Sequence, residues 1–442
     1  MRIIFIIMAF LFLTACSITT PEMNKPLDAT APAPILKSNR SEELTVILTF
    51  SGGGTRAAAL SYGVLKELRD TPIIINNKKR RLLDEVDLIS SVSGGSFTSA
   101  YYGLFGDRIF KDFERKFLKK RVQSDLLKLS LLSPKAWIRL LPRLFERSDL
   151  AAEYYHQFIF RKKHFRDIRK DSPYIIINAT DLSLGQGFSF TDYQFRWICS
   201  NIGDYPISRA VAASSAVPIL FSPITLENHA SKCSYSPIIW SSKDKTNKRH
   251  KQSLEIEKYR NDKQYKYLHL VDGGVVDNLG VRSLIDLTTY YGNNMWNTLK
   301  TYKMSKTKKL VFIVVDASGF PNLETAKNRV TPSTFDVFHR TTSIQANKYN
   351  VETLDLLRSK FPLWKEQIAK GRCSKMPTND CKDIEIDLIE VRLQDLVLKE
   401  KADLLHVPTS LELPPKIVDK LTEAGANLLR RSQTYQRLFK SP

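Results

Sequence analysis

The chain alternates short apolar runs with glycine-rich turns and helical spacing. Residues 44–50 (LTVILTF) form a run typical of a buried strand, and after a turn residues 57–68 show helical spacing of apolar positions. A second apolar run, residues 88–92, also precedes glycines and an apolar-rich segment. Further strand-like runs occupy residues 267–271 and 310–316. Strands that alternate with helices predict an α/β fold with a mainly parallel sheet.

Ser93 stands at the second of these turns. It follows an apolar run and precedes Gly94 and Gly95, so the order predicts a strand, a sharp turn and a helix. Such a turn exposes a serine for attack beside the free N–H groups of a helix N-terminus. The first glycine of a G-x-S-x-G elbow is Ser91 here. This motif alone is therefore equally compatible with a simple Ser/Gly turn that leads into a helix.

Two other turns carry groups that would complete a catalytic site. Three glycines between a strand and a helix free several N–H groups to bind an anion, either a phosphate or the oxyanion of acyl transfer. A carboxylate at a strand end, followed by two glycines, suits a general base. We expect all three turns at the carboxyl ends of parallel strands, where open α/β sheets bind ligands. The residues are Gly52, Gly53 and Gly54 in the cradle, and Asp272, Gly273 and Gly274 in the carboxylate turn.

These motifs, in this order, resemble the patatin-like phospholipase family. The segments 179–182 (ATDL) and 212–218 (AASSAVP) also look like family signatures, and the resemblance extends from about residue 44 to about residue 283. It implies a three-layer α/β/α fold with a mainly parallel central sheet and accessory helices. The chain departs from the family pattern at Ser91 and at Gly280, where a proline is common.

The resemblance also implies a Ser–Asp dyad without histidine, metal or cofactor. Ser93 would be the nucleophile, Asp272 would accept its proton, and the backbone amides of residues 52–54 would hold the oxyanion. Partial burial would raise the pKa of Asp272 towards the working pH. We expect Arg56 to brace the glycine loop or to meet an anionic headgroup; the alternative is a local contact on a helix N-terminal turn.

A Ser–His–Asp triad would require a histidine on a loop after the sheet. His269 lies three residues before Asp272 on a strand, which places it on the opposite face. Only His339 or His406 could follow the sheet as a triad requires, and neither has a suggestive context. No CxxC motif or paired histidines indicate a metal site.

The N-terminus predicts export and lipidation. The apolar run 3–13 would cover about 16 Å as a helix, well short of a hydrocarbon core of about 30 Å. Residues 1–15 therefore predict a signal peptide. Residues 13–16 (LTAC) resemble a bacterial lipobox, which implies acylation of Cys16, and Ser17 resembles an outer-membrane sorting signal. We expect a lipid-anchored protein of the bacterial cell envelope, in the outer membrane. The alternative is a simple cleaved signal with an ordinary Cys16.

The rest of the chain divides into a tether, a catalytic domain and an extension. Within the domain we expect a basic, apolar-rich helical region that lies in a lipid interface or covers the site as a lid; the alternative is ordinary amphipathic helices. A Lys-rich insertion is expected to be solvated or disordered. The ranges are a flexible tether at 16–43, a catalytic domain at 44–330 with the helical region at about 115–147 and the insertion at about 241–266, and a C-terminal helical or accessory extension at 331–442.

Charge and cysteine content indicate the surroundings. Lys and Arg number 67 against 46 Asp and Glu, a net charge of +21. No groove-reading motif indicates nucleic acid, so attraction to anionic lipid headgroups is the simpler explanation. Membrane lipids are thus the expected substrate and surface, and no protein partner is indicated. In an oxidising compartment, Cys199, Cys233, Cys373 and Cys381 could form two disulfides, and Cys373 with Cys381 is the candidate pair.

The leading hypothesis is a membrane-anchored serine lipid acyl hydrolase of the phospholipase A or lysophospholipase type. The alternative is a catalytically inactive, membrane-binding envelope lipoprotein with the same fold, for which the altered elbow at Ser91 is the only support. Nucleotide phosphate binding by the glycine loop is weaker, because the P-loop lysine is missing and Arg56 does not replace it at the required spacing.

Overall fold

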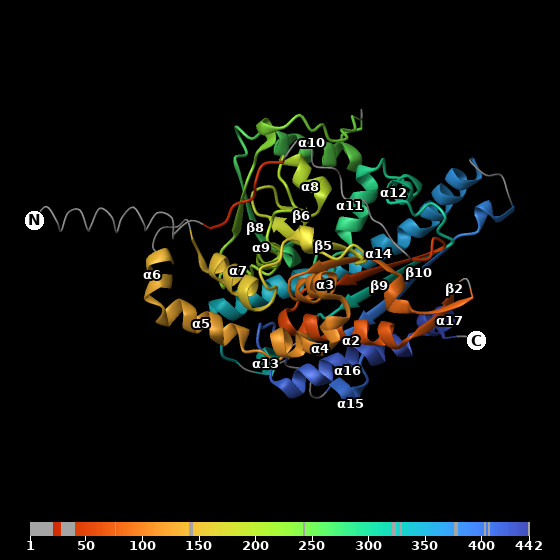
Figure 1. The fold of residues 1–442 in the computed structure, drawn as a ribbon. Helices are drawn as coiled ribbons and strands as arrows, with labels where there is room; N and C mark the ends of the chain where they lie inside the picture. The colour runs from red at the N-terminus through yellow and green to blue at the C-terminus, as the bar shows by residue number, and fades with distance from the viewer. Residues whose placement is uncertain are drawn as a thin grey trace, which may run out of the picture.

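The apolar runs form the strands of an eight-stranded sheet with helices on both faces (Figure 1). In this computed structural model the described residues are 21–27, 40–75, 77–140, 145–241, 244–320, 324–327, 329–374, 379–401, 404 and 407–440. The strands of the sheet are β1 (Leu44–Phe50), β4 (Val86–Val92), β5 (Tyr174–Asp181), β6 (Gln186–Phe190), β7 (Ile224–Glu227), β8 (Tyr267–Asp272), β9 (Lys309–Asp316) and β10 (Glu385–Arg392). Their order is β10-β9-β1-β4-β5-β8-β7, and β6 pairs with β5. β2 (Pro72–Ile75) and β3 (Lys78–Arg81) form a separate hairpin.

The sheet is mainly parallel, as the sequence predicts, but β8, the strand that ends at Asp272, runs antiparallel to its neighbours. The five strands from β10 to β5 run parallel, whereas β6, β8 and β7 pair antiparallel. The expectation that Asp272 ends a parallel strand is therefore wrong. β5 continues beyond its last pair with β4, and Asp272 pairs with Ala179 on this extension. The carboxyl end of β8 thus reaches the end of β4 from the opposite direction.

Alternation along the strands separates two apolar layers. Val311, Ile313 and Val315 of β9 belong to the larger core cluster, whereas its Leu310 and Phe312 belong to the second cluster on the other face. Figure 1 shows α2 and α16 below the sheet and α11 and α12 above it. The covering helices are α2 (Gly54–Asp70), α3 (Gly94–Phe105), α16 (Pro415–Arg431) and α17 (Gln433–Phe439) on one side, and α11 (Arg282–Tyr290), α12 (Met295–Thr301) and α14 (Thr334–Cys373) on the other. The expected three-layer α/β/α fold is confirmed.

The C-terminal part is integral to the sheet and its covering layer. β10 pairs with β9 along its whole length, and α16 packs directly on α2. The two helices approach so closely that a Cβ at Gly63 would lie 1.9 Å from the carbonyl oxygen of Thr422. The division at residue 330 into a domain and an accessory extension is therefore wrong, because the sheet edge and one helical layer come from the last part of the chain.

The Lys-rich insertion is not disordered where the structure describes it. Residues Lys248–Arg260 form α10, whose Ile256 and Tyr259 are buried. The hydroxyl of Tyr259 donates a 3.0 Å hydrogen bond to Asp181 at the end of β5. Its buried side chains and the bond to Asp181 hold this charged helix on the body, while most of its other residues are exposed. The segment is therefore solvated, as expected, and ordered where the structure describes it.

The basic region near residues 115–147 is helical, as expected. It includes a π-helical turn (Glu114–Leu118), α5 (Val122–Leu132) and α6 (Pro134–Leu140). The remaining helices are α4 (Ile109–Phe113), α7 (Arg147–Phe158), α8 (Asp192–Trp197), α9 (Ile207–Ser214), α13 (Glu324–Lys327) and α15 (Leu398–Lys401). Short 3-10 turns occupy Leu82–Glu85, Gly106–Arg108, Phe165–Asp167, Ala230–Lys232, Gly273–Val275, Asn379–Lys382 and Leu393–Asp395.

Part of the expected tether is docked on the body. The side chain of Asn24 is buried and donates to Ser200 Oγ at 2.9 Å and to the carbonyl oxygen of Glu227 at 2.8 Å. Pro26 forms an isolated β-bridge with Ser200. A flexible tether over 16–43 is therefore wrong for residues 21–27. The expected signal peptide and Cys16 lie outside the described residues, and none of the described helices has the length and apolarity needed to cross a membrane.

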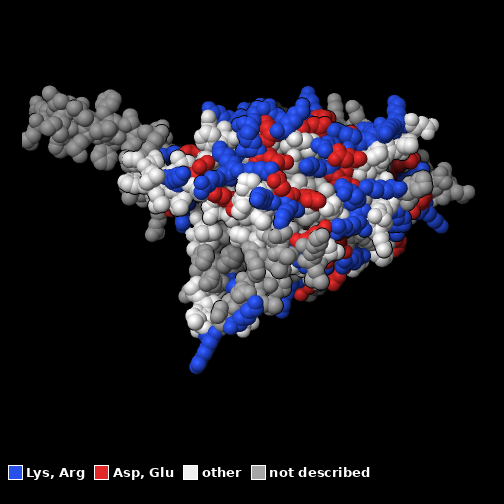
Figure 2. Space-filling view, turned by 90° about the horizontal axis from the view of Figure 1, so that it is seen from below, with Lys and Arg blue, Asp and Glu red and all other residues white. Residues whose placement is uncertain are grey.

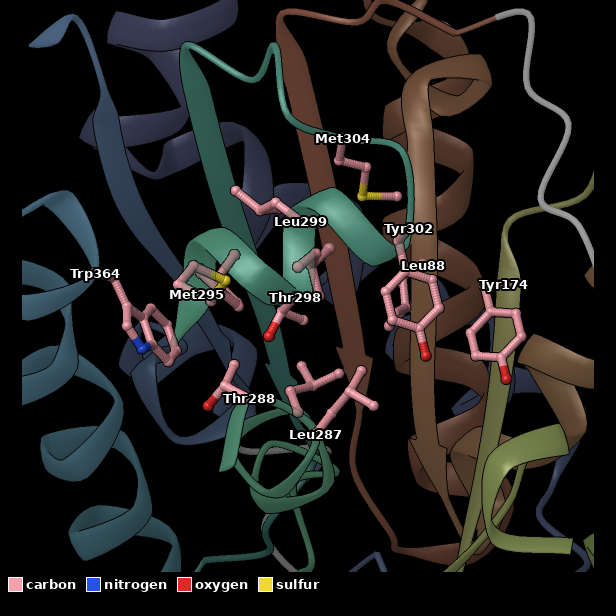
Figure 3. Close-up of a pocket in the computed structure, with 13 residues that line it drawn as sticks. Leu88, Tyr174, Leu287, Thr288, Met295, Thr298, Leu299, Tyr302, Met304 and Trp364 are labelled. Carbon is pink, nitrogen blue, oxygen red and sulfur yellow. The ribbon is translucent and has the colours of Figure 1, made fainter. Parts of the chain in front are cut away.

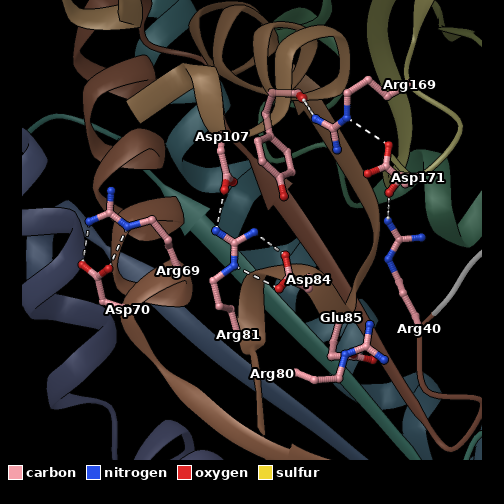
Figure 4. A network of polar contacts seen from close by, with 11 residues as sticks. Arg40, Arg69, Asp70, Arg80, Arg81, Asp84, Glu85, Asp107, Arg169 and Asp171 are labelled. Carbon is pink, nitrogen blue, oxygen red and sulfur yellow. Dashed lines mark hydrogen bonds and ion pairs between the residues drawn. The ribbon is translucent and has the colours of Figure 1, made fainter. Parts of the chain in front are cut away.

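Much of the positive charge is paired locally with carboxylates. Figure 2 shows Lys and Arg side chains interspersed with Asp and Glu over the face seen from below. At the network in Figure 4, Arg81 contacts both Asp84 and Asp107, and Arg80 contacts the buried Glu85. The pairs of Arg81 with Asp84 and Asp107 lie at the surface, and surface pairs contribute about 0–1 kcal/mol each, so these two organise the surface more than they stabilise the fold.

Two disulfides pair the four cysteines of the described chain. Cys373 bonds to Cys381, the candidate pair, and Cys199 bonds to Cys233. The second bridge joins the segment after α8 to the segment after β7, both of which contact residues 21–27 through Cys199 and Glu227.

Candidate active site

Ser93 occupies a strained turn between β4 and α3. Its backbone has φ 48° and ψ −118°, a positive φ that few residues other than glycine adopt. Close packing of the turn requires the glycines that follow: a Cβ at Gly94 would lie 1.9 Å from the carbonyl oxygen of Gly54, and one at Gly95 would lie 2.7 Å from that of Phe50. The sequence Ser-Gly-Gly thus folds into a tight elbow whose serine projects at the start of a helix.

The hydroxyl of Ser93 donates a 2.8 Å hydrogen bond to Oδ2 of Asp272, 179 positions later in the chain. Both side chains are buried, with exposed fractions of 5% and 8%. The other carboxylate oxygen, Oδ1, accepts a 2.8 Å hydrogen bond from the amide of Gly274. Gly273 lets the turn pack on β5, because a Cβ there would lie 2.4 Å from the carbonyl oxygen of Asn178.

Burial sets the proton affinity of this carboxylate. Desolvation raises the pKa of Asp272 to about 6, while the hydrogen bonds from Gly274 and Ser93 oppose the shift. A carboxylate with this pKa is ionised at neutral pH and yet more basic than an exposed aspartate. It can therefore take a proton from a neighbouring hydroxyl near neutral pH.

Two neighbouring side chains hold the backbone on either side of this pair. Ser214 Oγ, at the end of α9, accepts a 2.8 Å hydrogen bond from the amide of Ser93 and donates to the carbonyl oxygen of Asn178. Thr180 Oγ1 donates a 2.9 Å hydrogen bond to the carbonyl oxygen of Asp272. The segments 179–182 and 212–218 resemble the family, but the sequence did not predict a role for Thr180 or Ser214 within them. The available signal was a small polar side chain within an apolar segment.

The glycine loop lies against the elbow, but one of its three amides is already occupied. The amide of Gly52 donates a 3.0 Å hydrogen bond to the carbonyl oxygen of Asn278. This corrects the expectation that Gly52 helps to hold an oxyanion. Gly53 and Gly54 have φ values of 136° and 60°, and within the described residues neither amide donates a hydrogen bond. These two N–H groups are the candidates for binding an anion beside Ser93.

Arg56 braces the loop from within the protein. Its guanidinium is buried and donates to the carbonyl oxygens of Ala317 at 2.8 Å and Val407 at 2.6 Å. Burial lowers the pKa of Arg56 to about 10, and the carboxylate of Asp316 opposes the shift. The side chain is therefore committed to internal contacts, which supports the bracing interpretation and removes the expected contact with a headgroup.

The two departures from the family pattern have local structural roles. Ser91 is fully buried and forms hydrogen bonds with Ser99 Oγ at 2.6 Å and with the carbonyl oxygen of Ile176 at 3.0 Å. Gly280 has φ 71°, which a proline ring cannot adopt, and its carbonyl oxygen accepts a 2.6 Å hydrogen bond from Ser90. The elbow is therefore built around both residues.

Histidine does not take part in the described geometry at Ser93. His269 is exposed and contacts Thr225 Oγ1 at 3.0 Å, away from the carboxylate of Asp272. His339 lies in α14, although its side chain is outside what the structure describes, and His406 lies outside the described residues altogether. Among the described residues no group of His, Cys, Asp and Glu could hold a metal ion.

An apolar cavity lies elsewhere, between the sheet and the helices α11 and α12 (Figure 3). Leu88, Phe312 and Met295 are among its lining residues, and its volume is about 50 Å³. A cavity of about 150 Å³ is needed to hold a ring such as benzene. This space is therefore too small for an acyl chain, and we treat it as a packing gap of the second core cluster.

The chain resembles proteins of one known family. A family model described as patatin-like phospholipase matches residues 48–285, more than half of the chain. No curated protein matches. Similar solved structures include human GIVD cytosolic phospholipase A2 (16% identity over 67% of this chain and 50% of that chain, TM-score 0.34) and the same human protein in complex with methyl gamma-linolenyl fluorophosphonate (12%, 90% and 59%, TM-score 0.43). Another is the ExoU–SpcU complex of Pseudomonas aeruginosa (12%, 93% and 82%, TM-score 0.25). This chain spans half to three fifths of the length of the human chains that it matches.

Proposed function

The chain belongs to the patatin-like phospholipase family, and we propose that it is a membrane-anchored serine hydrolase that cleaves acyl esters of lipids. The observation that carries the proposal is the 2.8 Å hydrogen bond between Ser93 Oγ and Asp272 Oδ2. Within the described part of the chain, the amides of Gly53 and Gly54 in the neighbouring glycine loop donate no hydrogen bond. Nucleophile, base and anion-binding groups are the three parts that acyl transfer through a covalent intermediate requires.

In the first half-reaction, Ser93 Oγ attacks the carbonyl carbon of the ester while its proton passes to Asp272 Oδ2. The negative charge that develops on the carbonyl oxygen accepts hydrogen bonds from the amides of Gly53 and Gly54. When the tetrahedral intermediate collapses, the carbon–oxygen bond of the ester breaks. Asp272 then returns the proton to the departing alcohol, which leaves the acyl group on Ser93.

In the second half-reaction, water attacks the acyl-enzyme. The oxygen of the water molecule bonds to the acyl carbon while Asp272 removes one of the water protons. The amides of Gly53 and Gly54 hold the oxyanion again. The proton returns to Ser93 Oγ as the fatty acid leaves. The raised pKa of Asp272, about 6, suits a group that must both accept and release a proton in each cycle.

The family supports the proposed substrate class, and the sequence outside the described residues supports the proposed location. We propose glycerolipids as the substrate class, in a reaction of the phospholipase A or lysophospholipase type. A lipid on Cys16 would hold the protein at the outer membrane of a bacterial envelope, and the net charge of +21 favours anionic headgroups.

The alternative is a membrane-binding envelope lipoprotein whose site no longer turns over, for which Ser91 in the elbow is the motivating feature. Labelling with a fluorophosphonate probe separates the two. We expect the probe to modify wild-type protein at Ser93 and ester hydrolysis to disappear in Ser93→Ala, with the melting temperature nearly unchanged. Hydrolysis that persists in purified Ser93→Ala protein would end the assignment, and an unlabelled wild-type serine would favour the inactive alternative.

A further inference from the structure

Two segments that both contact α7 expose large apolar side chains: Asp125 of α5 accepts a hydrogen bond from Tyr154, and the carbonyl oxygen of Ile219 accepts one from Arg147. On the α5–α6 hairpin, Leu132 is 73% exposed, and in the loop after α9 Ile219 is 54% exposed. Scattered exposed leucines are ordinary, but neighbouring segments that present several together form a patch that calls for an explanation. We call this set the apolar end: Leu127, Leu131, Leu132, Trp137, Ile219 and Leu220.

The α5 helix has two apolar faces, and only one is used for packing. Val122 and Leu126, four residues apart, are buried on the body. Leu127 and Leu131 share a different face by the same spacing and point to solvent. Trp137 is half exposed, and its indole N–H donates a 2.9 Å hydrogen bond to the carbonyl oxygen of Ser130. With that donor satisfied, the ring can enter an apolar surface at little cost.

The second segment of the apolar end lies beside the candidate site. Ile219 has φ 75°, which is an outlier for a β-branched residue. The guanidinium of Arg147, at the start of α7, donates a 3.0 Å hydrogen bond to its carbonyl oxygen. Ile219 follows Ala216 by three residues, and the carbonyl oxygen of Ala216 accepts the amide of Asp272. A strained, exposed isoleucine is therefore within about 11 Å, along the chain, of the backbone that positions the base.

The described N-terminal segment reaches the same end. α7 packs against α5, and Tyr154 of α7 donates a hydrogen bond to Asp125 of α5. Figure 1 shows α5, α6 and α7 together at the side where residues 21–27 run. Only residues 17–20 separate Cys16 from this docked segment, a reach of about 17 Å when extended.

We propose that the apolar end inserts into the surface of a bilayer that contains anionic lipids and so turns the Ser93 site towards the membrane. The exposed Lys128 and Arg147 lie beside these apolar residues and fit negatively charged headgroups. A short link from Cys16 would hold this same end against the bilayer. A bilayer therefore fits these features better than a second copy of the chain does. The benefit to catalysis rests on the proposed function, whereas the binding itself does not.

The test compares two double variants in the full chain with Cys16→Ser, which removes the proposed acylation site. Leu131→Ser/Leu132→Ser changes the apolar end, and Ile74→Ser/Leu254→Ser changes exposed apolar residues on β2 and α10, outside this end. Flotation with vesicles of equal parts phosphatidylcholine and phosphatidylglycerol measures binding. We expect the first variant to bind at least about tenfold more weakly and the second to bind like its parent.

Hydrolysis of a water-soluble short-chain ester without vesicles separates this proposal from the proposed function. We expect both variants to retain that activity. Unchanged vesicle binding in Leu131→Ser/Leu132→Ser would overturn the docking surface, even if the ester is hydrolysed. A dimer of the parent that this variant dissociates, with vesicle binding unchanged, would assign the apolar end to a second copy instead. A parent that binds vesicles through Leu131 and Leu132 but hydrolyses no ester would refute the proposed function alone.

Discussion

The hydroxyl of Ser214 holds the backbone of Ser93 in place, because its Oγ accepts the Ser93 amide at 2.8 Å and donates to the carbonyl oxygen of Asn178 at 2.6 Å. The two serines are 121 positions apart. The bond satisfies the first amide of an elbow whose positive φ costs energy in any residue but glycine. Ser214 is thus a positioning residue: it sets where the nucleophile stands without contacting the ester.

Replacing Ser214 with alanine should reduce turnover without removing the nucleophile. The Ser93 amide would lose its acceptor in a buried place, so we expect kcat to fall about 10- to 100-fold and KM to change little. Ser215→Ala is the matched control, because that hydroxyl donates to the carbonyl oxygens of Val211 and Ala212 in α9 and contacts Tyr155, whereas the amide of Ser93 bonds to Ser214. Equal losses in both variants would refute a specific role for Ser214.

The activity should depend on pH through the carboxylate of Asp272. The base must be ionised, and burial raises its pKa to about 6. We therefore expect kcat/KM to fall about tenfold per pH unit below pH 6 and to be constant above it until another group titrates. A profile of ester hydrolysis between pH 4 and pH 9 measures this midpoint. An acid limb centred near pH 4 would indicate an exposed carboxylate instead.

Asp272→Asn should abolish hydrolysis and should also change how stability depends on pH. The pKa of this aspartate is raised from 3.8 when unfolded to about 6 when folded. Its protonated form favours the fold, so the contribution is complete below pH 3.8 and is lost as the pH rises through 6. Asparagine does not titrate. Between pH 4 and pH 8 the stability of the variant relative to wild type should therefore rise by about 2 kcal/mol.

Urea unfolding at the two pH values measures that difference. Asp355→Asn is a suitable control, because its carboxylate lies on the surface with 68% of the side chain exposed. We expect its stability relative to wild type to shift by less than about 1 kcal/mol over the same range. If the unfolding free energies of Asp272→Asn and Asp355→Asn depend on pH in the same way, burial does not destabilise the ionised form of Asp272 as we propose.

Gly94→Ala should disrupt the site through the glycine loop. The new methyl group would lie 1.9 Å from the carbonyl oxygen of Gly54, and a backbone atom cannot move aside as a side chain can. We expect a loss of about 1–3 kcal/mol in unfolding free energy and at least a hundredfold loss of activity. Gly187→Ala, where nothing lies within 4 Å of the added Cβ, should leave both unchanged. Thermal unfolding and ester hydrolysis of the two variants decide the matter.

The sequence predicts the local parts of this site because their signals are short. Strand periodicity before Ser93, the glycines after it and the turn after Asp272 all depend on neighbouring residues and on backbone sterics. The alternation of strands and helices predicted the mainly parallel sheet, and the resemblance to the family implied the α/β/α layers. The expectation for Cys373 and Cys381 was local as well, since only eight positions separate them.

Tertiary packing decided everything that depends on distant partners. The direction of β8 follows from an extension of β5 that no periodicity reveals, and Gly52 is unavailable as a donor because a carbonyl 226 positions later accepts its amide. The Lys-rich segment folds because Tyr259 reaches Asp181, and residues 21–27 dock because Asn24 is buried against Ser200 and Glu227. The sequence determines which donors and acceptors are present and which backbone conformations adjacent residues allow. Which amide, carboxylate or apolar face is already occupied depends on contacts between segments that only the folded chain brings together.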